Sequence, residues 1–199
     1  VEEFVAETAS ESPAPGGGSI SAGMGAMGAA LATMVANLSS HKHGWDDRWE
    51  EFSNWAEQGK ACHVELLRLI DADTDAFNKI MDALGLPKGT DAEKTARQAA
   101  LQAATKLAIE IPLKVMQTAL AGMEVIKAMA EIGNPNSVSD AGVGALAARS
   151  AVMGAYLNVK INCAGLADKA YVTQVVAQGA ELERQAVTYE REILAIVNG

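Results

Sequence analysis

Apolar residues recur along most of the chain at steps of three and four positions, the spacing of one face of an α-helix. No stretch alternates with a period of two, and an Asn-Gly turn occurs only at the C-terminus, so neither strands nor tight hairpins are predicted. Glycine- and proline-containing breaks divide this pattern into six segments. The sequence therefore predicts helices at about 2–10, 19–39, 46–84, 91–132, 139–163 and 169–199.

Individual residues indicate where these helices start and bend. Thr90 and Glu93 have the spacing of a capping box, and Ser139 and Asp168 are expected to cap the fifth and sixth helices. Pro112 lies inside the fourth helix and is expected to kink it, because proline removes one backbone hydrogen bond. Since the chain shows no internal repeat and no low-complexity tail, residues 1–199 are predicted to form a single all-α domain, a bundle of long helices.

Composition supports a tightly packed helical protein. The 199 residues include 38 alanines against three Phe, three Trp and three Tyr, and alanine is the best helix former. The net charge of −9 argues against nucleic acid and anionic membranes as partners, because both require basic patches. No uninterrupted apolar run reaches the length of a membrane span, and no leader opens the chain. A cytoplasmic protein is the simplest interpretation.

Metal chemistry is not expected from this sequence. Two cysteines are too few for a disulfide framework or a cysteine metal cluster. The three histidines have no carboxylate or histidine partner at the spacing of metal ligands, so no metal site is predicted.

One carboxylate occupies an unexpected position in the third predicted helix. Cys62, Leu66, Leu69, Ile70, Phe77, Ile80 and Leu84 form an apolar stripe, and Asp73 lies on this stripe. Its neighbours Asp71 and Asp75 point toward the polar side of the helix. Burial of an unpaired carboxylate is costly, so Asp73 is expected either to form a structural ion pair or hydrogen bond, or to act as an acid or base in a site.

Two further features have both a structural and a functional interpretation. On the fifth helix Asn158 and Asn162 share a face made otherwise of small residues. The two amides either bridge to a neighbouring helix or face a polar heterocycle. The Gly16–Ser19 turn is either a flexible break with a serine cap or a helix N-terminus whose free N–H groups bind an anion.

Taken together, the motifs resemble the formiminotetrahydrofolate cyclodeaminase family, which includes monofunctional methenyltetrahydrofolate cyclohydrolases. The resemblance rests on five segments in the family's order and covers nearly the whole chain. The first three are Ser12–Ser19 with the Ala/Gly/Met helix after it; Asp71–Phe77; and Leu86–Lys88 with Glu93, Lys94 and Arg97. The last two are Ile111–Leu113; and Gly133–Asn134 with Ser139, Asp140 and Gly154–Asn162.

The resemblance implies an all-helical homodimer or larger assembly that acts on a one-carbon unit carried by tetrahydrofolate, without a metal or redox cofactor. It assigns the catalytic aspartate to Asp73, the residue that the apolar stripe also selects. The substrate-binding residues that it implies are Gly16, Gly17, Gly18, Ser19, Lys88, Arg97, Asp140, Asn158, Lys160 and Asn162. Lys88, Arg97, Lys106 and Lys160 are candidates for holding the carboxylates of the folate glutamate tail, which predicts a locally basic pocket.

Three functions remain open at this point. The first is cyclodeamination of 5-formiminotetrahydrofolate to 5,10-methenyltetrahydrofolate and ammonia, with Asp73 as general acid and base and a separate formiminotransferase as a possible partner. The second is hydrolysis of 5,10-methenyl- to 10-formyltetrahydrofolate. The third is a helical dimerisation module without catalysis.

Overall fold

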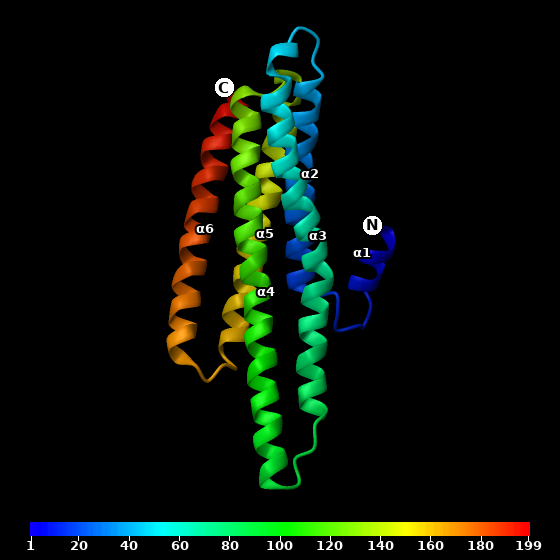
Figure 1. The fold of residues 1–199 in the computed structure, drawn as a ribbon, viewed down its shortest axis with the longest axis vertical. Coiled ribbons are helices and arrows are strands. Elements are labelled where there is room, and N and C mark those ends of the chain that lie inside the picture. The colour runs from blue at the N-terminus through cyan, green and yellow to red at the C-terminus, as the bar shows by residue number, and fades with distance from the viewer.

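The computed structural model describes residues 1–199 and contains helices without strands, which confirms the all-α prediction (Figure 1). Two one-turn 3-10 helices, η1 (Asp46–Arg48) and η2 (Pro135–Ser137), precede the third and fifth α-helices. The α-helices are α1 (Glu2–Thr8), α2 (Gly17–Ser40), α3 (Trp49–Gly85), α4 (Asp91–Ile132), α5 (Val138–Cys163) and α6 (Lys169–Asn198).

Four long helices form the bundle. Helices α2, α3, α4 and α5 run antiparallel to their neighbours in sequence, and α6 packs against α4 and α5 (Figure 1). The α3–α4 hairpin extends beyond the ends of the other helices (Figure 1). The core is one continuous cluster whose largest fully buried side chains include Phe52, Leu66, Met116, Met123 and Ile126.

Helix α2 buries its small residues rather than its large ones. Ala22, Ala29 and Ala32 are almost completely buried, whereas Met27 is 58% exposed. A Cβ atom at Gly28 would lie 2.8 Å from the carbonyl oxygen of Gly144 on α5, closer than atoms in van der Waals contact. Glycine at this position therefore lets the α2 and α5 backbones touch, while Met27, Met34 and Leu38 of α2 remain exposed.

Most of the predicted helix ends are confirmed. The Thr90 side chain accepts from the Glu93 N–H while the Glu93 carboxylate accepts from the Thr90 N–H, so the capping box is complete. Asp168 caps α6 by accepting from the Tyr171 N–H at 3.0 Å. The cap predicted at Ser139 is wrong, since α5 begins at Val138 after Ser137, because the one-turn helix η2 leads directly into it.

The predicted stripe on α3 is correct in its first half and shifts at its end. Leu66 and Leu69 are fully buried, but Leu84 is 44% exposed and Ala83 is buried in its place. An α-helix has 3.6 residues per turn, so the buried face moves around a helix of this length. Helix α4 continues through Pro112 without interruption.

Helix α2 is long and apolar enough, by length and composition, to cross a membrane. The sequence expectation concerned an uninterrupted apolar run, which Ser21, Thr33 and Asn37 break in α2, so this helix meets the criterion only on its average composition. Of the most apolar window of α2, 67% is buried inside the molecule, because α3, α4 and α5 all pack against this helix. A core helix satisfies the same criterion, since its apolar residues face protein instead of lipid.

Candidate active site

A cavity of about 230 Å³ lies where the start of α2 meets the second half of α3, the middle of α4 and the last turns of α5. Its lining brings together most of the motifs that the sequence separates by up to about 150 positions. The lining residues are Pro13, Ala14, Gly16, Gly17, Gly18, Asp73, Thr74, Phe77, Ile80, Ala108, Asn158 and Asn162.

Asp73 is the one ionisable side chain in this lining. It is partly buried, whereas Asp71 and Asp75 are exposed, as predicted from the helix face. The Ser19 hydroxyl donates to Oδ2 of Asp73 at 2.9 Å. Burial raises the pKa of Asp73, and hydrogen bonds from the hydroxyl and backbone N–H of Ser19 oppose this rise. The carboxylate therefore faces the cavity without a cationic partner.

Ser19 has a different role from the cap that its position suggests. It lies inside α2, where Gly16 is the N-cap residue and makes no side-chain cap. Ser19 is completely buried, and its hydroxyl donates across to Asp73 on α3 rather than back along its own helix. The serine cap expected at this turn is therefore wrong.

Gly18 makes room for the Asp73 carboxylate. A Cβ atom at position 18 would lie 2.5 Å from Cγ and 2.6 Å from Oδ2 of Asp73, well inside van der Waals contact. Any other residue here would displace the carboxylate or the start of α2. Within the glycine run, Gly18 is thus the position that the carboxylate requires sterically.

The two asparagines are oriented by backbone carbonyls. Nδ2 of Asn158 donates to the carbonyl of Gly154 at 3.0 Å, and Nδ2 of Asn162 donates to the carbonyl of Ala108 on α4 at 2.7 Å. Asn162 thus bridges to a neighbouring helix, as the structural interpretation expects, and it also lines the cavity. Contact between these amides and a polar heterocycle stays a prediction. A Cβ atom at Gly17 would lie 3.4 Å from Nδ2 of Asn158, so the glycine turn covers this amide closely.

The predicted basic lining is absent from the cavity within this chain, because no lysine or arginine contributes to it. Arg97 donates to the carbonyl of Leu84 at 3.1 Å and so binds the end of α3. The ammonium groups of Lys106 and Lys160 lie over the rings of Tyr171 and Tyr156. Lys88 is exposed in the α3–α4 connection. Their role in binding a carboxylate tail stays a prediction.

Asp140 lies away from the cavity. It is in the first turn of α5, whereas Asn158 follows 18 residues later, which corresponds to about 27 Å along the helix axis. The sequence motif that contains Asp140 is therefore not brought to Asp73 within one chain.

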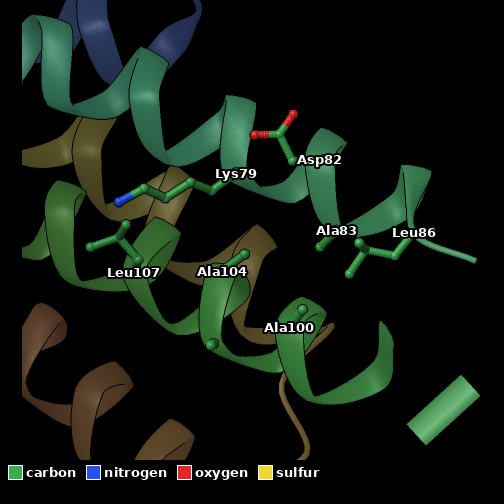
Figure 2. A pocket seen from close by; sticks show the side chains of 8 residues that line it. Lys79, Asp82, Ala83, Leu86, Ala100, Ala104 and Leu107 are labelled. Atoms are coloured by element: carbon green, nitrogen blue, oxygen red, sulfur yellow. The ribbon is translucent and has the colours of Figure 1, made fainter. Parts of the chain in front are cut away.

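A second, larger groove of about 470 Å³ lies between the last turns of α3 and the first half of α4 (Figure 2). The groove and the cavity share the same pair of helices, since Ile80 and Ala108 line the cavity while Lys79 and Leu107 line the groove. Lys79 is a cation in this groove that the sequence did not single out, because a lysine on the polar side of a helix has the pattern of an ordinary surface residue. The remaining groove residues are Asp82, Ala83, Leu86, Ala100, Ala103 and Ala104 (Figure 2).

Comparison with known proteins identifies the family. The family model of formiminotransferase-cyclodeaminase matches residues 1–181. The chain belongs to this family. The methenyltetrahydrofolate cyclohydrolase of Methylorubrum extorquens is 39% identical over 174 residues, which cover 87% of this chain and 84% of that protein. The formimidoyltransferase-cyclodeaminase of Mus musculus is 34% identical over 191 residues, which cover 96% of this chain but 35% of the mouse protein.

The fold agrees with this family assignment. The solved structure of formiminotetrahydrofolate cyclodeaminase from Thermotoga maritima superposes with a TM-score of 0.89 and 28% identity, covering 100% of this chain and 96% of that one. The chain spans about a third of the length of the mouse relative. Membership of the family supports an enzyme that acts on a folate-bound one-carbon unit, by cyclodeamination or by cyclohydrolysis.

Proposed function

We propose that this protein is a formimidoyltetrahydrofolate cyclodeaminase in which Asp73 binds the substrate and transfers protons. The observation that carries the proposal is the Asp73 carboxylate, which faces a polar cavity and is held by Ser19 without any cation to neutralise it. Such a carboxylate is suited to a cationic ligand. The formimino group of 5-formiminotetrahydrofolate is an amidine, which is protonated at neutral pH, and a charge-assisted hydrogen bond to Asp73 would hold it.

The reaction requires one proton to move between two nitrogen atoms. N10 attacks the amidine carbon, and the new carbon–N10 bond closes a five-membered ring. Asp73 takes the proton from N10 and returns it to the terminal nitrogen, whose bond to carbon then breaks to release ammonia. The positive charge stays on 5,10-methenyltetrahydrofolate, so atoms and charge balance without an added reagent. Asn158 and Asn162 are proposed to orient the pterin, which brings N10 close to the carbon.

Cyclohydrolysis is the second candidate, favoured by the relative from Methylorubrum extorquens, which is 39% identical and named for that reaction. In this case water attacks the same carbon of the cationic methenyl substrate, and Asp73 takes one proton from it as the general base. The carbon–N5 bond then breaks, the second proton of the water passes to N5, and the formyl group stays on N10. One carboxylate in the same position serves either reaction, so the assay must separate them.

The test is to assay the purified protein with 5-formiminotetrahydrofolate while measuring methenyl absorbance and ammonia together, and to assay methenyl hydrolysis in parallel. We expect methenyl product and ammonia to form in equal amounts. Methenyl hydrolysis without ammonia release would replace the proposal by the cyclohydrolase function, and the absence of both reactions would refute catalysis on these substrates.

Asp73→Asn tests the role of the carboxylate. The amide has nearly the same shape but cannot accept the proton, so turnover should fall about 10²- to 10⁴-fold while the helical content stays unchanged. Asp71→Asn and Asp75→Asn are matched controls on the exposed side of α3 and should retain turnover. Full turnover by Asp73→Asn would contradict the proposed role of the carboxylate and place the proton transfer on another group.

A further inference from the structure

Pro112 and Asn162 meet at one backbone carbonyl. In a regular α-helix the carbonyl of Ala108 accepts from the N–H of the residue four positions later, which here is Pro112. Proline has no N–H, so this carbonyl loses its partner within the helix. Nδ2 of Asn162 on α5 donates to it at 2.7 Å. A side chain from another helix thus replaces the hydrogen bond that the proline removes.

This contact fixes which end of the Asn162 amide faces the cavity. A carbonyl can only accept a hydrogen bond, so the NH₂ group of Asn162 must point to Ala108 and its oxygen must point elsewhere. Oδ1 of Asn162 accepts no hydrogen bond from the protein, although Asn162 and Ala108 both line the cavity. Pro112 itself is buried and does not line the cavity.

We propose that Pro112 is a positioning residue: it frees the Ala108 carbonyl to hold the Asn162 amide, so that Oδ1 of Asn162 is presented to the cavity as an acceptor for a ligand N–H. The reduced pterin of the proposed substrate carries such N–H groups, and in this respect the inference rests on the proposed function. The proline in the middle of α4 therefore contributes to binding geometry as well as to the shape of the helix.

The test uses Pro112→Ala, and Pro112→Ser as a second variant, since each restores an N–H that competes for the Ala108 carbonyl. Both residues are better helix formers than proline, so folding should be retained, and circular dichroism checks this. With ¹⁵N-labelled asparagine, NMR follows the side-chain amide of Asn162 in the ligand-free protein. We expect its exchange with solvent to rise about fivefold, as expected for the loss of a hydrogen bond worth about 1 kcal/mol.

Asn158 is the matched control, because its amide donates to Gly154 on its own helix and not to α4. Its signal should not change in either proline variant. An unchanged Asn162 amide in both variants would overturn the proposal. This measurement needs no turnover, so it remains decisive even if neither folate reaction is observed and the proposed function fails.

Turnover adds a second, independent criterion. If Pro112 acts through Asn162, Pro112→Ala should reduce kcat/KM about tenfold in the parent protein and not at all in an Asn162→Ala background, since that background has lost the group being positioned. Combined with Asn158→Ala, its effect should instead multiply. Losses that multiply in both backgrounds would show a general effect on α4 and contradict the positioning role.

Discussion

At the scale of single residues, the site depends on a carboxylate that is partly buried and uncompensated. Asp73 receives hydrogen bonds from Ser19 alone, and burial raises its pKa. The folded state therefore binds this proton more tightly than the unfolded chain does. Its contribution to stability is fully present below the ordinary pKa of 3.8 and is lost as pH rises through the folded-state pKa. Function rather than folding therefore accounts for a carboxylate at this position, because Asp73→Asn is expected to make the protein unfold less readily at neutral pH.

The acid limb of the pH profile tests this electrostatic setting. Because Asp73 must be ionised to bind a cation, kcat/KM should fall on acidification with a midpoint above 3.8, the ordinary value for aspartate. Ser19→Ala removes the hydroxyl that favours the ionised form, so the midpoint should move to higher pH. The measurement is kcat/KM against pH for both proteins. A midpoint that moves to lower pH in Ser19→Ala would contradict the assignment of this limb to Asp73.

Gly18→Ala tests the steric requirement at the carboxylate. The added methyl group would overlap Asp73, so we expect turnover to fall about 10²-fold, the effect of moving a catalytic group by about 1 Å. Gly23→Ala is the control on the same helix, since its Cβ would meet Ile70 at 3.8 Å, an ordinary contact. Equal turnover in the two variants would show that Asp73 does not need its observed position.

At the scale of helices, small residues let α2 and α5 approach each other closely. The contact between Gly28 on α2 and Gly144 on α5 leaves no space for a methyl group. The same approach brings the start of α2 toward the last turns of α5, which is where Gly17 covers Asn158. Packing of small residues therefore sets the width of the cavity.

Gly28→Ala should lower the free energy of unfolding by about 1–3 kcal/mol, the usual effect of overpacking a core, because the methyl group meets the Gly144 carbonyl at 2.8 Å. Gly122→Ala on α4 is the control, with its nearest neighbour, Cβ of Ala29, at 3.5 Å. That substitution should be neutral or stabilising by up to about 1 kcal/mol, as alanine favours helix. Chemical denaturation measures both. Equal stability of the two variants would contradict the proposed close packing.

At the scale of the whole molecule, the bundle leaves large apolar side chains on its surface. Met27 on α2 is 58% exposed, and Leu157 and Ile161 on α5 are 62% and 72% exposed. The last two flank Asn158 in sequence, so the outer face of α5 next to the site is apolar. Exposed apolar surface of this kind is typical of an interface between protein chains.

We therefore expect a homodimer or larger assembly. Sedimentation velocity at micromolar concentration should give at least twice the 20.7 kDa mass of the chain. Combining Leu157→Glu and Ile161→Glu should shift the protein toward monomer, since charges would be buried in the contact. Val187→Glu on α6 replaces another exposed apolar residue and should leave the assembly intact. A stable monomer of the unmodified protein at this concentration would contradict the prediction.

Local patterns in the sequence determined the helices, the capping box at Thr90 and the position of Asp73 on the apolar stripe of its helix. Periodicity and capping both depend on residues three or four positions apart. The sequence also selected Asn158 and Asn162 as a pair, since one helix turn separates them. Tertiary structure alone decided the partners of these groups: Ser19 for Asp73 and the Ala108 carbonyl for Asn162 are each more than 50 positions away. Hydrogen bonds of that kind depend on how helices pack, and so does the absence of lysine from the cavity lining. Periodicity identifies the buried face of a helix, but only packing determines which group on another helix lies opposite it.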